Sequence, residues 1–163
     1  MNKIYGAQGR QDGLYAIGRN KWELIYGFGK DNADDESGWN WRQRFTQKPS
    51  LSEIENIIKE TINAETDEKI LSGFSWRDMP VWLSQENQFN YKTAYDLAVQ
   101  FGGATLPIKF KFGTDEEPQY FVFENMEDFT DFYLKASQYV SETLNAGWDE
   151  KEWVHNNLSI FEC

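Results

Sequence analysis

The sequence predicts an α+β protein in which an N-terminal antiparallel β-meander precedes a helix–β-hairpin–helix–β-hairpin–helix core. Three observations predict this class. Aromatic and β-branched runs over residues 13–46 are separated by turns containing Gly and Asn. Later stretches place apolar residues at helical spacing, and between them lie two pairs of short strand-like runs. We therefore expect a β-meander region over residues 1–48 and an α+β core over residues 49–163, which can pack as one domain.

The meander is expected to have three strands, over residues 13–17, 22–28 and 39–46. An arm or edge strand precedes them, and a polar acidic loop separates the second strand from the third. Side chains alternate across a strand, so the third strand separates into two faces. One face is expected to hold Trp39, Trp41, Gln43 and Phe45, and the other Asn40, Arg42 and Arg44.

The core begins at a capping box formed by Ser50 and Glu53, after which isoleucines recur at helical spacing. A hairpin with Arg77 and Asp78 in its turn follows. The remaining expected elements are a helix over residues 85–101, a hairpin over residues 106–123, a helix from Asn125 to Gly147 and a short helix over residues 149–156. Asn and Ser before helices act as N-caps, and Gly ends helices.

Composition argues against several classes of function. The 163 residues have a net charge of −11, which argues against binding to nucleic acids or anionic membranes. No stretch reaches the roughly 20 apolar residues of a membrane-spanning helix, so we expect no membrane insertion, and the N-terminus has no signal-peptide core. The one cysteine, Cys163, excludes an internal disulfide.

No catalytic or metal-binding motif is recognisable. The acidic loop over residues 29–38 lacks the ligand spacing of an EF-hand, and the single histidine, His155, is expected at an exposed helix end. With 27 Asp and Glu, a carboxylate pair for glycoside cleavage is possible by composition. The one candidate is Glu86, near Trp82 and Trp76 in the sequence, and an acidic residue is already expected there because the position is the first turn of a helix. We predict no enzymatic activity, no cofactor and no metal.

The stretches GFSWRDMPVWLSQENQFNYKTAYDLA and LPIKFKFGTDEEPQYFVFENMEDFTDFYLKASQYV resemble a phage-associated family of unknown function, found in bacteriophage and prophage tail-fibre and tail-accessory proteins. The resemblance covers about residues 53–146. The matching positions are Gly73, Trp76, Pro80, Trp82, Ser84, Asn87, Asn90, Phe110, Phe112, Phe123, Phe129 and Tyr139. The family's first hairpin turn often contains Asn-Gly, where this chain has Arg77-Asp78. These are packing and turn positions, so the resemblance implies a place among phage structural proteins and no reaction.

Together, these observations predict a structural or fibre-assembly accessory protein of a phage tail, made in the cytoplasm of a bacterial host and able to associate with virions. Its expected partners are other tail proteins or itself. Five tryptophans are the candidate anchors: Trp22, Trp39, Trp41, Trp76 and Trp82. The alternative is a carbohydrate-binding module for host glycans, which requires two coplanar exposed indoles, for example Trp39 and Trp41.

Overall fold

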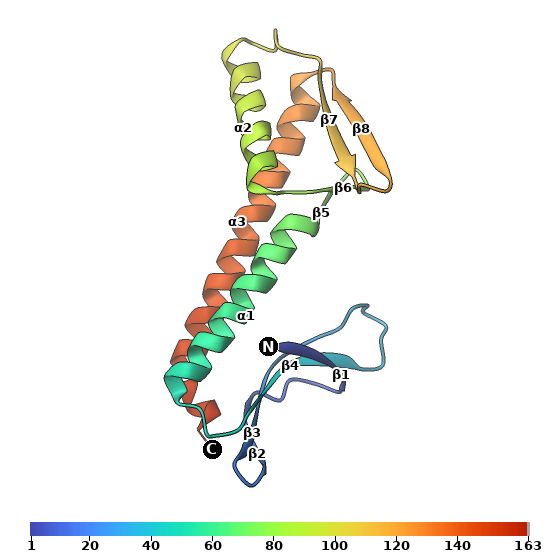
Figure 1. The fold of residues 1–163 in the computed structure, drawn as a ribbon. Helices are drawn as coiled ribbons and strands as arrows, with labels where there is room; N and C mark the ends of the chain where they lie inside the picture. Colours follow the sequence, from blue (N-terminus) through green and yellow to red (C-terminus); the bar gives the residue numbers. More distant parts are fainter. Residues whose placement is uncertain (163) are drawn as a thin grey trace. The chain divides into compact units, whose positions relative to one another are not determined.

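The computed structural model describes residues 1–162 and confirms the α+β class (Figure 1). Cys163 lies outside the described residues. The strands are β1 (Asn2–Ala7), β2 (Gly13–Gly18), β3 (Lys21–Gly29), β4 (Gly38–Phe45), β5 (Phe74–Trp76), β6 (Met79–Val81), β7 (Ile108–Gly113) and β8 (Pro118–Phe123). The helices are α1 (Leu51–Ser72), α2 (Gln85–Gln100) and α3 (Met126–Asn156), followed by the short 3₁₀ helix η1 (Leu158–Phe161).

The chain forms two compact units. The strand unit comprises Met1–Asn63 together with the chain from Trp148 onward, and the hairpin unit comprises Ala64–Gly147. The predicted boundary at residues 48/49 separates the β-meander from the α+β core, whereas these units divide both α1 and α3. Each long helix therefore contributes one end to each hydrophobic core.

The strand unit contains a four-stranded antiparallel sheet in the order β1-β4-β3-β2. The predicted meander forms β2, β3 and β4, and the N-terminal arm adds β1 as an edge strand. The register pairs Tyr26 with Trp41 and Trp22 with Phe45, so the predicted alternation along β4 defines two faces. We call the face that bears Leu24, Tyr26 and Trp41 the inner sheet face.

The inner sheet face packs on the first half of α1 and the end of α3. Leu24 and Tyr26 from the sheet meet Ile54 and Ile58 from α1 and Val154 from α3 in one buried cluster. Ion pairs and hydrogen bonds between α1 and α3 border this core; His155 Nδ1 lies 2.8 Å from Glu55 Oε1, and Lys151 Nζ donates to Asn63 Oδ1 at 2.8 Å. Burial of this apolar surface is the main stabilising contribution to the unit.

The hairpin unit has an aromatic core around Trp76. Its ring lies 4.8–6.4 Å, centroid to centroid, from four phenylalanine rings. These are Phe112, Phe121, Phe123 and Phe132, which come from β7, β8 and α3. Trp76 is 2% exposed, and its indole N–H donates to Asp131 Oδ2 at 2.9 Å, so its polar atom is paired despite burial.

The predicted β5–β6 hairpin is present with a two-residue turn. Arg77 and Asp78 both have positive φ, 50° and 64°, which is the signature of a type I′ turn. Asn-Gly would meet this requirement at lower cost, but Arg77-Asp78 adopts the same turn. Arg77 in this turn forms an ion pair with Asp128, and its guanidinium lies 4.3 Å from the Trp76 ring centroid.

The predicted N-caps are present in the structure, but one predicted helix end is not. Backbone N–H groups bond the predicted cap side chains of Ser50, Ser84 and Asn125. The predicted end of a helix at Gly147 is wrong, because α3 continues to Asn156. A Cβ at Gly147 would lie 2.6 Å from Thr66 Oγ1, so this glycine permits close helix packing and does not end the helix.

Within residues 1–162, no helix has the length and apolar character needed to span a membrane. The same described residues contain no cluster of three or more His, Cys, Asp or Glu side chains arranged to hold a metal ion.

Candidate functional site

The face of the N-terminal sheet opposite α1 and α3 is the candidate site, and we call it the outer sheet face. Strand register places its side chains in rows across the sheet; Tyr15 pairs with Glu23, and Glu23 with Arg44. Alternation from these positions completes the set. The outer sheet face comprises Asn2, Ile4, Tyr15, Ile17, Lys21, Glu23, Ile25, Asn40, Arg42 and Arg44.

Three large apolar side chains on the outer sheet face are open to solvent. Ile4 is 43%, Tyr15 43% and Ile17 45% exposed. They come from β1 and β2, the two edge strands, so they lie on either side of the polar middle of the face. Large apolar side chains beside polar groups are typical of surfaces that bind another protein.

The middle of the outer sheet face is charged. The Glu23 carboxylate accepts from Arg44 Nε at 2.8 Å and lies 3.5 Å from Arg42 Nη1. The Glu23 side chain is only 10% exposed, whereas that of Arg44 is 77% exposed. A hollow of about 490 Å³ lies beside these three residues, lined also by Met1, Asn2, Ile4 and Gln43. With Lys21, three cationic side chains face one carboxylate, so the outer sheet face has a positive charge.

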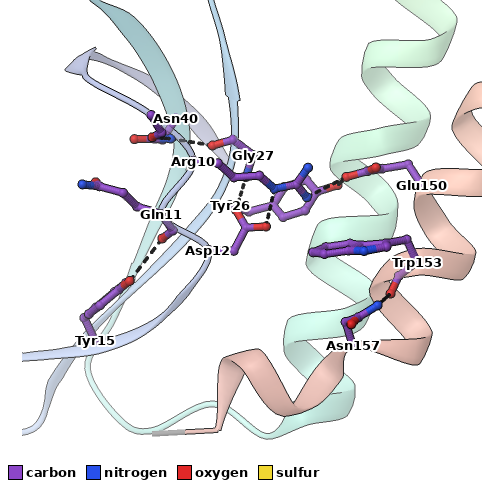
Figure 2. A network of polar contacts seen from close by, with 11 residues as sticks. Arg10, Gln11, Asp12, Tyr15, Tyr26, Gly27, Asn40, Glu150, Trp153 and Asn157 are labelled. Carbon is purple, nitrogen blue, oxygen red and sulfur yellow. Dashed lines mark hydrogen bonds and ion pairs between the residues drawn. The ribbon is translucent and has the colours of Figure 1, made fainter.

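A polar network supports one end of the sheet (Figure 2). Arg10 donates from Nε to Asp12 at 2.6 Å and from Nη2 to Glu150 at 2.9 Å. The Glu150 carboxylate also accepts from the Tyr26 hydroxyl at 2.5 Å, and the Arg10 guanidinium lies 4.5 Å from the Trp153 ring centroid. The segment between β1 and β2 is thereby attached to β3 and to α3.

The same segment is attached to the outer sheet face. Buried Asn40 donates from Nδ2 to the carbonyls of Gly27 and Gly9, at 2.5 and 3.2 Å, and the Tyr15 hydroxyl donates to the Gln11 carbonyl at 3.3 Å. Tyr15, an exposed member of the face, therefore has its ring position constrained. The network is a structural support, because each of its charged groups is paired within it.

The network's hydrogen bonds and burial shift the pKa values of Arg10 and Tyr26. Burial lowers the pKa of the Arg10 guanidinium, but hydrogen bonds to Asp12 and Glu150 outweigh that effect and raise it overall. Burial, followed by the hydrogen bond to Glu150, raises the pKa of the Tyr26 hydroxyl well above its ordinary value. Arg10 is thus held as a cation and Tyr26 as a neutral donor.

The five tryptophans proposed from the sequence lie in different environments. Trp76 is 2% and Trp39 9% exposed, while Trp22 and Trp41 are half-buried beside the strand-unit core. Trp82 is 52% exposed and is the one open indole of the five. Trp76 is a core residue, and we therefore remove it from the set of candidate contacts.

Trp39 and Trp41 do not form a flat platform. Their rings are 5.4 Å apart with an interplanar angle of 69°, and the Lys3 ammonium lies 4.2 Å from the Trp39 ring centroid. The Trp39 indole N–H donates to Asp31 in the acidic loop at 3.1 Å. A glycan-binding site based on coplanar exposed rings has no support from this pair.

The sequence pattern places Arg42 and Arg44 on one face of a strand but does not mark that face as a site. Ile4, Tyr15 and Ile17 are not among the predicted contacts, which are all tryptophans. A detectable signal lies in β2, where Tyr15 and Ile17 alternate with Ala16. Which face the helices cover depends on tertiary packing, and pattern alone leaves it open.

No protein-family model, curated protein or solved structure matches this chain.

Proposed function

We propose that this chain is a non-enzymatic protein of a bacteriophage or prophage tail, either a structural component or an accessory of fibre assembly. The sequence resemblance over residues 53–146 supports the phage setting. The observation that supports a contact function is the outer sheet face, where exposed apolar side chains border a positively charged centre. Through this face the chain would contact another protein.

The composition of the face matches that role. Apolar side chains lose water on association and supply affinity, whereas charged groups govern orientation and the rate of encounter. The Glu23 carboxylate positions the Arg44 guanidinium without neutralising the whole face. Arginine in such a position can pair bidentately with a partner carboxylate.

Cosedimentation with phage structures tests this proposal. Epitope-tagged chain is expressed together with the phage genes, and tails and assembly intermediates are separated on a density gradient. The test variant is Ile4→Ser/Ile17→Ser, which removes two exposed apolar side chains from the outer sheet face. The matched control is Val99→Ser/Leu134→Ser, which removes two exposed apolar side chains, 54% and 59% exposed, from the hairpin unit.

We expect wild type and the control to cosediment with tail structures, and the outer-face variant to be reduced at least about tenfold, as for loss of two apolar interface contacts. Equal cosedimentation of both variants would contradict the assignment of the outer sheet face. Absence of the wild type from every fraction containing phage structural proteins would contradict the phage setting itself.

A further inference from the structure

The N-terminal sheet and the hairpin unit differ in their balance of charge. Over residues 1–50 the sequence has eight Lys or Arg and six Asp or Glu. Over residues 64–147 it has six Lys or Arg and fourteen Asp or Glu. The segment that forms the sheet therefore has a small excess of cations, whereas the hairpin unit has a large excess of carboxylates. The whole strand unit, residues 1–63 and 148–163, has ten Lys or Arg and thirteen Asp or Glu, so any attraction between copies is local to the sheet.

Three exposed basic groups of the strand unit lie on or beside the outer sheet face. Lys21 and the 77%-exposed Arg44 belong to this face, and exposed Arg19 lies in the adjoining β2–β3 turn. Among the described residues, Arg19 and Lys21 have no ion-pair partner. The outer sheet face and its border thus present cations that are open to a partner's carboxylates.

In the hairpin unit, ion pairs inside the unit use most of the cations. Four of the six form them: Arg77, Lys92, Lys111 and Lys135. Two of the carboxylates outside these ion pairs lie at the tip of the β7–β8 hairpin. Glu116 and Glu117 are exposed there, and the turn is closed by hydrogen bonds between Thr114 and Glu117 at 3.0 and 3.3 Å.

From this complementarity we propose that a second copy of the chain occupies the outer sheet face, with the β7–β8 tip of one copy against the Arg19, Lys21 and Arg44 cations of the next. The proposal rests on the proposed function of the outer sheet face and assigns its partner. Because two different surfaces meet, the contact is heterologous, and repetition gives a ring or a filament.

Local attraction competes with the repulsion of two chains that each have a net charge of −11. At about 0.15 M salt the Debye length is about 8 Å, so distant like charges are screened while contacting pairs still attract. Association by exposed ion pairs weakens at high salt. The self-association should therefore be strongest near physiological ionic strength and decline toward 1 M NaCl.

Complementary charge reversal tests the proposal by light scattering and sedimentation velocity. The face variant is Arg19→Glu/Lys21→Glu, and the tip variant is Glu116→Lys/Glu117→Lys. The control, Asp67→Lys/Glu68→Lys, changes the net charge by the same amount as the tip variant but on α1. Circular dichroism verifies that each variant is folded.

We expect wild type and the control to exceed the monomer mass of 19.1 kDa at high micromolar concentration in 0.15 M NaCl. The face and tip variants should each weaken association at least about tenfold, and an equimolar mixture of the two should restore it, because acidic faces then meet basic tips.

A mass of 19.1 kDa for wild type under all conditions would overturn the proposal. Failure of the mixture to reassociate, or equal weakening by the control, would also overturn it. These results are separable from the phage assay, since a monomeric chain that still cosediments with tails refutes only the second copy as partner.

Discussion

Replacing Arg10 by methionine should destabilise the strand unit, because the network of Figure 2 depends on this guanidinium. Methionine keeps an unbranched apolar stem and removes the charge and all donors. The Asp12 side chain is 6% exposed, and its carboxylate would retain the Gly27 backbone N–H at 2.7 Å as its remaining partner. Glu150 is 36% exposed and would keep the Tyr26 hydroxyl.

The cost is dominated by Asp12. A hydrogen bond to a charged group is worth about 1.5–3 kcal/mol when the group left behind is buried. The Glu150 pair is solvent-exposed and adds at most about 1 kcal/mol. Loss of the cation–π contact with Trp153 adds about 0.5–1 kcal/mol. We therefore expect Arg10→Met to lower the free energy of unfolding by about 2–5 kcal/mol.

Urea unfolding followed by both circular dichroism and tryptophan fluorescence measures this change and tests whether the two units unfold together. Arg19→Met is the matched control, since Arg19 is exposed and has no ion pair within residues 1–162; its cost should stay within about 0.5 kcal/mol. If Arg10→Met and Arg19→Met cost the same, the network does not stabilise the unit and the reasoning fails. If Asp12 dominates, Asp12→Asn/Arg10→Met should cost less than the sum of the single changes.

Three further predictions follow from the same structure. Glu23→Gln leaves Arg42 and Arg44 without their carboxylate and should lower the free energy of unfolding in urea by about 1–3 kcal/mol. The control Asp34→Asn, in the exposed acidic loop, should lower it by less than about 0.5 kcal/mol, and equal changes would contradict a stabilising role for Glu23. Trp76→Ala should lower the free energy of unfolding by about 3–5 kcal/mol, because it leaves a cavity in the aromatic core. Trp82→Ala removes an indole that is 52% exposed and should lower it by less than about 1 kcal/mol; the reverse order would refute the burial assignment. Burial raises the pKa of Tyr91 to about 12, and the raised pKa stabilises the fold fully below pH 10 and progressively less as the pH rises from 10 toward 12. Absorbance at 295 nm should show part of the tyrosine signal titrating only near pH 12 in the folded protein, and complete tyrosine titration near pH 10 would contradict this.

Local features of this fold are readable from the sequence because neighbouring residues determine them. The N-caps at Ser50, Ser84 and Asn125 follow from side-chain oxygens placed to bond the first helical N–H groups. The faces of β4 follow from its alternation of aromatic and polar residues. Both hairpins follow from turn residues between apolar runs.

Features that depend on contacts distant in sequence are not readable in this way. Gly147 has the local signature of a helix end, but it lies within α3. A glycine is needed there because Thr66 on α1 occupies the space that a side chain would need. The covered face of the sheet and the burial of Trp76 likewise depend on which elements pack together. The candidate site was missed for the same reason, since exposure of Ile4, Tyr15 and Ile17 is a property of the assembled sheet.

Site-specific photo-crosslinking tests the central claim, contact through the outer sheet face, most directly. p-Benzoylphenylalanine is placed at Ile17 on the outer sheet face or at Leu134 on α3, both exposed, in cells that express the phage genes. Irradiation at Ile17 should give a discrete crosslink to a phage structural protein or to a second copy of this chain, identified by mass spectrometry, and Leu134 should give little. Crosslinks from Leu134 alone, or none from Ile17, would contradict the claim that the outer sheet face is the contact surface.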